Sequence, residues 1–234
     1  MCFPAAVAGA DAQPHALVHG LAGTPGCASK PCFKQGCPAF PSPSAEENHI
    51  TFPLAISHDF IGEILQPYRA HSRYLKSARL MHVRDKSSAA TSDAAVIRAE
   101  GRFSIEESCY IEDTGHFNAV EFNICYNQLA YVMFGKCVAE GLMHRLRTEK
   151  VSVPTFSEFK RHQLPNMVIV NIESRYYRQL DSRDFTGTLQ LDRISPVGRA
   201  WFFFTTMTFA DREGVKAKGS VVLAFNPDFE ARAH

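Results

Sequence analysis

The sequence predicts an α+β fold in which one antiparallel sheet wraps around a single long helix. Two observations carry this prediction. The segment 117–134 contains neither Gly nor Pro and is largely apolar on every side, which is typical of a buried helix. Four strand-like runs follow it along the chain. A single sheet folded around the helix is the simplest way to remove its apolar surface from water.

The first part of the chain differs in composition from the rest. Residues 1–48 are rich in Pro, Ala, Gly and Ser, and few aliphatic residues recur there with any period. We expect this stretch to be a disordered or loosely ordered extension, followed by one packed domain over residues 49–234. We do not expect a secretory signal at its start, because it lacks a basic region and Pro4, Pro14 and Pro25 interrupt any apolar run.

Three elements are expected before the buried helix. The segment 57–68 predicts a short amphipathic helix that Ser57 caps and Pro67 ends. The segments 74–83 and 94–105 alternate apolar and polar residues, and they predict two strands joined by a polar, Ser-rich turn.

The elements after the buried helix are mostly strands. Residues 137–160 are mixed, and we expect a helical turn or two among them. The four strands are predicted at 167–180, 185–195, 199–210 and 215–225, because turn residues separate these runs. This order of elements is that of the hot-dog fold.

Bulk composition excludes several classes of function. The formal net charge is +1, with 45% hydrophobic and 21% charged residues, so nothing favours binding to nucleic acid or to an anionic membrane. No apolar run is long enough to span a bilayer. The seven cysteines include no CxxC pair, and we expect neither a metal site nor a cofactor. Three cysteines lie in apolar surroundings, as reduced core residues of a cytoplasmic protein would: Cys109, Cys125 and Cys137.

The predicted buried helix carries polar residues that need partners. At about 100° per residue, three of them share one face and two share another. The first face holds Asn118, Glu121 and Gln128, and the second holds Asn123 and Asn127.

The start of this helix is the predicted active site. Gly115 lets the backbone approach a ligand, and the amides from Gly115 to Phe117 could stabilise a negatively charged thioester oxygen. His116 and Glu121 are the candidate acid and base. Structural alternatives remain open. Asn118 and Glu121 have the spacing of a capping box, and His116 could serve only the fold.

Further alternatives concern other polar residues. Asn127 and Gln128 could bond to neighbouring strand backbones. Tyr68 and Tyr110 could serve packing alone.

The segment 101–131 resembles the FcoT-like thioesterase family. The likeness is densest in the TGHFNAVE run at 114–121 and the NQLAY run at 127–131. It continues thinly from Ile61 to Phe225, through Gln66-Pro67-Tyr68 and the HQL run at 162–164. The resemblance implies a hot-dog fold and an acyl-thioester substrate, in a pocket associated with Tyr68, Tyr110 and Asn127.

The resemblance also implies one of two activities. Some members hydrolyse long-chain acyl-CoA, and others add glycine to the β-carbon of a (2E)-enoyl thioester on an acyl carrier protein. We favour glycine addition, because an anchor for the glycine carboxylate would explain Arg175 and His162. Tyr68 and Tyr110 are further candidates for this anchor. We expect Asn118 to bind substrate as well. The expected partners are an acyl carrier protein or CoA thioester, glycine, and a second copy of the chain in a homodimer or an oligomer of dimers.

Rival classes are an enoyl hydratase or dehydratase and a non-catalytic acyl-thioester binding protein. The family resemblance disfavours the first. The second would be expected to carry a DNA-binding segment, and residues 1–48 show neither a helix-turn-helix pattern nor a basic run.

Overall fold

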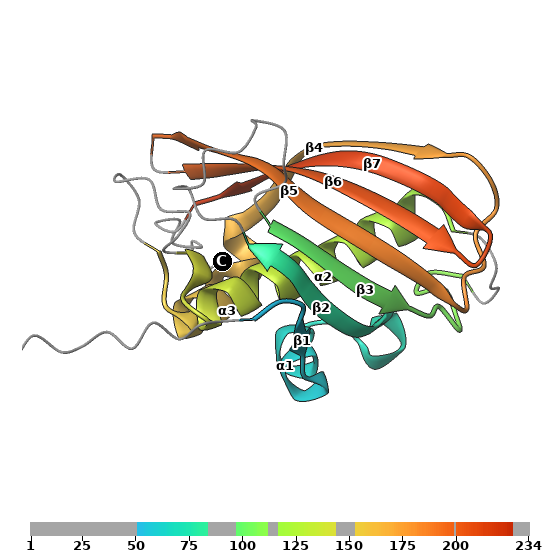
Figure 1. Cartoon of the computed structure of the whole chain (residues 1–234), viewed down its shortest axis with the longest axis horizontal. Helices are drawn as coiled ribbons and strands as arrows, with labels where there is room; N and C mark the ends of the chain where they lie inside the picture. Colours follow the sequence, from blue (N-terminus) through green and yellow to red (C-terminus); the bar gives the residue numbers. More distant parts are fainter. Residues whose placement is uncertain (1–50, 84–96, 112–116, 144–152, 199, 227–234) are drawn as a thin grey trace, which may run out of the picture. The chain divides into compact units, whose positions relative to one another are not determined.

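The computed structural model of the chain describes residues 51–83, 97–111, 117–143, 153–198 and 200–226. They form one antiparallel sheet of seven strands in the order β1-β2-β3-β5-β6-β7-β4. The sheet curves over the long helix α2, Ala119–Ala139 (Figure 1). The strands are β1 Leu54–Ile56, β2 Leu75–Val83, β3 Ile97–Phe103, β4 Met167–Tyr176, β5 Phe185–Val197, β6 Ala200–Asp211 and β7 Gly214–Phe225. The predicted α+β hot-dog fold is confirmed.

Side chains alternate strictly along the middle of the sheet. In β6, every second residue from Trp201 to Phe209 is buried, whereas the residues between them are partly exposed. This period of two is expected for a strand with one face on a core. The buried side chains of β6 contact α2 through pairs such as Phe134 and Phe203, whose ring centroids are 4.7 Å apart.

Helix α2 is buried along most of its length, and 13 of its 21 residues are buried. Two glycines that face each other across β3 and β5, Gly101 and Gly187, let the helix approach the sheet closely. A Cβ on Gly101 would lie 2.6 Å from Leu75 Cδ1 and 3.1 Å from Leu129 Cδ1, closer than packed side chains allow. The predicted 117–134 helix is therefore correct in type and position.

Helix α2 continues to Ala139, five residues beyond the predicted end. Packing extends it: a Cβ on Gly135 would lie 2.9 Å from Ile64 Cδ1, so the helix lies directly against α1 there. Helix α1, His58–Ile64, begins after the predicted cap, since the Phe60 amide donates to Ser57 Oγ at 3.3 Å. It ends before Pro67, earlier than the predicted boundary.

Three elements differ from the prediction: β1 and a 3-10 helix were not predicted, and α3 is longer than expected. Strand β1 is only three residues long, too short for alternation to be visible. Helix α3, Phe156–Asn166, is longer than the expected helical turn or two and contains Pro165. Its start is fixed by a capping box in which the Thr155 amide donates to Glu158 at 2.8 Å. A short 3-10 helix also spans Ala70–Ser72.

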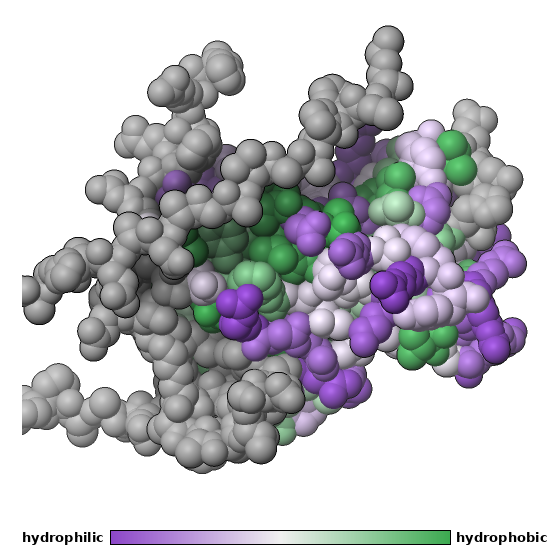
Figure 2. Space-filling model, turned by 90° about the horizontal axis from the view of Figure 1, so that it is seen from above, coloured by the Kyte–Doolittle hydropathy of each residue, from purple (hydrophilic) through white to green (hydrophobic). Residues whose placement is uncertain are grey.

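Seen from above, a group of hydrophobic residues lies near the middle of the coloured surface, and smaller hydrophobic groups lie among hydrophilic residues elsewhere (Figure 2). No helix in the described ranges is long and apolar enough to cross a membrane. The predicted extension at 1–48 lies outside the described residues, so the domain boundary stays a prediction.

Candidate functional site

The start of α2 is closed by a reciprocal pair of hydrogen bonds. Asn118 is the N-cap residue, and its Oδ1 accepts from the Val120 amide at 2.8 Å. The Asn118 amide donates in turn to Glu121 Oε2 at 3.2 Å. The capping-box alternative is thus confirmed for this pair. Two amides that could have bound a substrate oxygen, those of Asn118 and Val120, are occupied by the cap.

Glu121 is held in the core by neutral donors. Only 1% of this residue is exposed, and its Oε1 accepts from the Ser108 hydroxyl at 3.0 Å. No lysine, arginine or histidine in the described part of the chain forms an ion pair with it. A buried carboxylate is costly unless its oxygens are hydrogen-bonded, so Ser108 and the Asn118 amide are what allow Glu121 to lie there.

The segment before α2 is anchored to the sheet side of the core. The buried Tyr74 accepts a hydrogen bond from the Cys109 amide through its hydroxyl, at 2.8 Å. The next residue, Tyr110, is 48% exposed, and its hydroxyl accepts from Asn118 Nδ2 at 2.7 Å. Tyr110 and Asn118, both predicted to bind substrate, therefore lie together at the start of α2.

Phe117 closes the apolar side of this region. Its ring centroid lies 4.8 Å from that of Phe209 and 5.3 Å from that of Phe185. It also lies 6.4 Å from Tyr176, at the end of β4. Phe117 thus contributes a side chain to an aromatic wall, a role different from the backbone role predicted for it.

A cleft of about 660 Å³ opens between the start of α2 and the chain that leaves β4. Aromatic rings and polar groups both contribute to its lining. It is lined by Phe117, Asn118, Tyr176, Tyr177, Arg178, Gln179 and Leu180. An apolar wall facing a few polar groups is the usual character of a small-molecule site.

Tyr176 links the aromatic wall to the buried carboxylate. Its hydroxyl lies 2.9 Å from Ser174 Oγ. Burial raises the pKa of Tyr176, the Ser174 hydrogen bond opposes this, and the nearby Glu121 adds to the rise. The phenol therefore stays protonated at neutral pH and can donate a hydrogen bond in the cleft.

The other polar residues of α2 have different surroundings. The fully buried Gln128 accepts through Oε1 from the Tyr74 and Leu75 amides, each at 3.0 Å, and donates to the Ser72 carbonyl at 2.6 Å. The strand-bonding alternative is confirmed for Gln128. Asn127 is half-buried and instead donates to Asn123 Oδ1 at 3.2 Å.

Tyr68 lies away from the cleft. Burial raises the pKa of its hydroxyl, and Tyr131 and Cys125 of α2 raise it further. These neighbours place Tyr68 against the middle of the helix, whereas Asn118 caps its first turn. The structure does not join Tyr68 to the pair formed by Tyr110 and Asn118.

The two residues expected to anchor a carboxylate lie apart. His162 is on α3, which leads directly into the start of β4. Arg175 is eight residues after Met167 along β4, about 26 Å at the rise of a strand. Arg175 is paired with Lys218 on the outer face of the sheet, whereas Tyr176 points to the inner face with Ala217. Arg175 is thus outside the cleft of its own chain.

The reason for this orientation is an irregularity in β4. The register shifts between Ile169 and Asn171, so one extra residue is inserted in this strand. A bulge reverses the alternation of every later side chain. Counting by twos from the buried Met167 would place Arg175 on the inner face, and the bulge turns it outward.

Two predicted site residues, Gly115 and His116, lie outside the described residues. Sequence reasoning missed Ser108 and the run of cleft residues at the end of β4 and just after it, Tyr176, Tyr177, Arg178, Gln179 and Leu180. Ser108 lies in the block that resembles the family, and this position was the only signal for it. No group of three or more His, Cys, Asp or Glu that could hold a metal occurs in the described ranges.

Comparisons with known proteins agree with this architecture. The family described as "FcoT-like thioesterase domain" matches residues 63–225. A (2E)-enoyl-[ACP] glycyltransferase from Streptomyces coeruleorubidus is 36% identical over 168 residues, covering 70% of this chain and 93% of that protein. A protein of the same name from Mycobacterium marinum is 37% identical over 174 residues, covering 73% of this chain and 86% of that protein.

Solved structures resemble the chain more distantly. A putative thioesterase from Syntrophus aciditrophicus has a TM-score of 0.39 at 12% identity, covering 71% of this chain and 94% of that one.

Proposed function

The chain belongs to the FcoT-like thioesterase family, and from this premise we propose that it adds glycine to the β-carbon of a (2E)-enoyl thioester carried by an acyl carrier protein. The observation that carries the proposal is the cleft at the start of α2, whose lining combines the aromatic rings of Phe117 and Tyr176 with the polar groups of Asn118 and Arg178. The relatives at 36% and 37% identity that are named (2E)-enoyl-[ACP] glycyltransferase support it.

The aromatic wall suits the acyl chain. Phe117 and Tyr176 line the cleft with ring centroids 6.4 Å apart, and the buried Phe122 packs behind both, so an enoyl chain lying on these two rings would lose contact with water. Burial of apolar surface stabilises by about 25 cal/mol per Å². The thioester carbonyl would then lie near Asn118 Nδ2 and the Tyr110 hydroxyl, which are 2.7 Å apart.

The reaction balances without an oxidant, a reductant or a cofactor. The neutral amine nitrogen of glycine bonds to the β-carbon, and the π electrons of the double bond move toward the thioester carbonyl. The resulting enolate takes a proton at the α-carbon, and the nitrogen loses one. Groups that stabilise the enolate oxygen lower the barrier most. Amides from Gly115 to Phe117 remain our proposal for this role.

Proton transfer is assigned to His116 and Glu121 as a proposal. Glu121 is 1% exposed and already accepts two hydrogen bonds, so it reaches substrate only through neighbours such as Ser108. His116 is two residues before the N-cap Asn118. We therefore propose His116 as the group that takes the ammonium proton, with Glu121 positioning the start of α2.

Arg178 is our candidate for the glycine carboxylate. It lines the cleft beside Asn118 and Tyr176 and forms no salt bridge with a described residue. A guanidinium can clasp a carboxylate through two parallel hydrogen bonds. This replaces the anchor expected at Arg175, which faces the other side of the sheet. Tyr68, Asn127 and His162 stay proposals for binding other parts of the substrate.

The test is incubation of the purified chain with a medium-chain (2E)-enoyl thioester, with and without glycine, followed by mass spectrometry. A glycine-dependent adduct is expected, and it should be lost in His116→Ala. Free acid released equally without glycine would contradict glycine addition and establish a thioesterase, the activity that the family description favours.

The role of Arg178 has its own variant and control. Arg178→Ala should raise KM for glycine about tenfold to a hundredfold, the value of a charge-assisted hydrogen bond, with a smaller effect on KM for the thioester. Arg183→Ala removes an exposed arginine five residues away, outside the cleft, and should change neither constant. Equal effects of the two variants would exclude Arg178 as the anchor.

We also propose that two copies of the chain associate through β4. This is an edge strand of the sheet, and its first half exposes Val168 by 52%, Val170 by 52% and Ile172 by 39%. An apolar edge with unpaired backbone groups favours pairing with another chain. Val168→Lys combined with Val170→Glu should convert a dimer into a monomer in light scattering. Unchanged mass would exclude this edge.

A further inference from the structure

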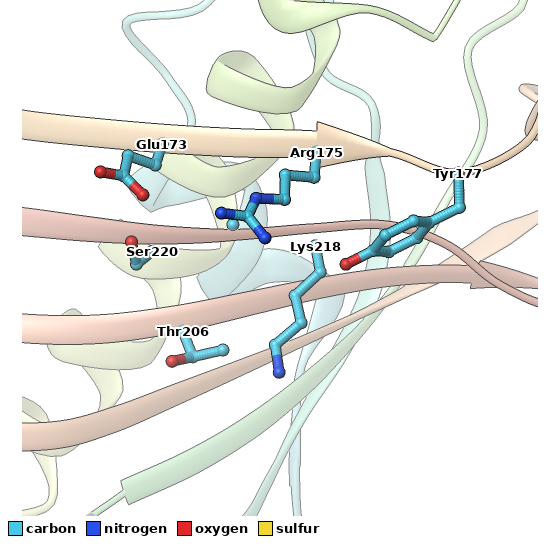
Figure 3. Close-up of a pocket in the computed structure, with 7 residues that line it drawn as sticks. Glu173, Arg175, Tyr177, Thr206, Lys218 and Ser220 are labelled. Atoms are coloured by element: carbon cyan, nitrogen blue, oxygen red, sulfur yellow. The ribbon is translucent and has the colours of Figure 1, made fainter.

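A second pocket, of about 250 Å³, lies on the outer face of the sheet, outside the site described above. Its lining comes from β4, β6, β7 and the residue after β4. Figure 3 shows six of the side chains that line it: Glu173, Arg175, Tyr177, Thr206, Lys218 and Ser220.

Two positive charges face each other across this pocket. Arg175 on β4 and Lys218 on β7 are direct partners in the register, and both are exposed. Like charges at directly opposed positions destabilise a sheet. Neither residue has a salt bridge within the described part of the chain. Both cations are therefore available to bind an anion in this pocket.

Other donors join the two cations. The hydroxyls of Tyr177 and Ser220 form no hydrogen bond with a described residue, so both are free to donate. In Figure 3 the Tyr177 hydroxyl points toward the position of Lys218, and the Arg175 guanidinium lies on the other side of that position. This is the donor set of a site for a phosphate or another small oxyanion.

Two acidic groups also face this region. Glu173 lies two residues before Arg175 on the same face, and its carboxylate points away from the guanidinium (Figure 3). Asp192 accepts a hydrogen bond from the Thr206 hydroxyl at 2.8 Å, which occupies that donor. Neither acid forms a salt bridge with Arg175 or Lys218.

We propose that this pocket binds the phosphate of the pantetheine arm that carries the acyl thioester. The pocket and the cleft at the start of α2 share one lining residue, Tyr177, so they are adjacent around the end of the edge strand β4. The phosphate is held outside the sheet, the arm passes Tyr177, and the thioester enters the cleft. This inference rests on the proposed function, because it takes the substrate to be a pantetheine thioester.

The test measures binding alone, so it is independent of whether glycine is added. Isothermal titration of the full chain compares pantetheine with 4′-phosphopantetheine and coenzyme A. We expect 4′-phosphopantetheine to bind about tenfold or more tighter than pantetheine, as charge-assisted hydrogen bonds would give. In the double variant Arg175→Ala with Lys218→Ala, this difference in affinity should disappear. In the wild-type chain, the affinity for 4′-phosphopantetheine should fall as the salt concentration rises.

The control variant is Lys76→Ala combined with Arg79→Ala, which removes the same charge from β2, elsewhere in the sheet. It should keep the full difference between the two ligands. If coenzyme A binds as tightly as 4′-phosphopantetheine, the phosphate of the arm is sufficient for recognition. If coenzyme A binds more tightly and the Arg175 and Lys218 variant loses this gain, the pocket also binds the phosphates of the nucleotide. Equal binding of pantetheine and 4′-phosphopantetheine, or a difference that survives in that variant, overturns the proposal.

Discussion

The Ser108 hydroxyl donates a hydrogen bond of 3.0 Å to the carboxylate of Glu121, inside a core where only 1% of Glu121 is exposed. The same carboxylate accepts from the amide of Asn118 at 3.2 Å. One buried acid thus joins the segment before α2 to the first turn of the helix. The geometry of the cleft depends on this junction, because Glu121 holds Asn118 in place and Asn118 in turn donates a hydrogen bond to Tyr110.

Removing the Ser108 hydroxyl should destabilise the fold. In Ser108→Ala, one oxygen of Glu121 loses its partner while it stays buried, and such a loss costs about 1–3 kcal/mol. Urea denaturation of the variant and the wild type measures it. In the Glu121→Gln background the same change should cost less, because a neutral amide needs the hydroxyl less than a carboxylate does. Additive costs would show that the two side chains do not act together.

Two substitutions of Asn118 separate capping from substrate binding. Asn118→Ser keeps a good capping residue but cannot reach the Tyr110 hydroxyl, so its free energy of unfolding should change by less than about 0.5 kcal/mol. Asn118→Ala loses the cap as well and should cost about 0.5–2 kcal/mol. Both variants should lose activity in the glycine-addition assay. Full activity in the stable Asn118→Ser variant would exclude a role for its contact with Tyr110.

Two glycines should respond oppositely to alanine. In Gly101→Ala the new methyl group would lie 2.6 Å from Leu75 Cδ1, and such overpacking costs about 1–3 kcal/mol. Gly62 lies in α1, and a Cβ added there would have no atom within 4 Å, so Gly62→Ala should stabilise by about 0.5–1 kcal/mol through helix propensity. Thermal unfolding of both variants checks the pair. A stable Gly101→Ala variant would mean that α2 does not lie so close to the sheet.

The fold should weaken at alkaline pH. Burial raises the pKa of five phenols above the ordinary value of 10.0, and that of the Cys137 thiol from 9.0 to about 12. The phenols are Tyr68, Tyr74, Tyr126, Tyr131 and Tyr176. The unfolded chain releases these protons first. The stability that these groups contribute should therefore be constant below about pH 8 and fall as pH rises through 9 and above, by up to about 1.4 kcal/mol per pH unit for each group.

Tyr126→Phe provides the matched variant for this pH dependence. It removes one buried phenol together with its 2.8 Å contact to Thr205, which should cost about 1 kcal/mol at pH 7. The alkaline decline of the variant should be shallower than that of the wild type. Denaturation at about pH 7 and about pH 10.5, on either side of the ordinary phenol pKa, compares them. Equal slopes would show that Tyr126 ionises freely in the folded chain.

The sequence by itself was sufficient for the main elements. The apolar run at 117–134 predicted the buried helix, and strand-like runs bounded by turn residues predicted β2, β3, β5, β6 and β7 to within a few residues. These signals are local, because a period of 2 or 3.6 is present in a short stretch of chain. The family resemblance at 101–131 lies within the matched region 63–225.

Only the tertiary structure decided what the functional side chains face. Ser108 contacts Glu121, and Tyr176 contacts Phe117, across distances in sequence that no local pattern reports. The clearest case is Arg175. Simple alternation from Met167 would put it inside, and the bulge between Ile169 and Asn171 turns it outward beside Lys218. A bulge depends on how β4 pairs with β7, so the face that Arg175 takes is a property of the pairing and not of the strand sequence.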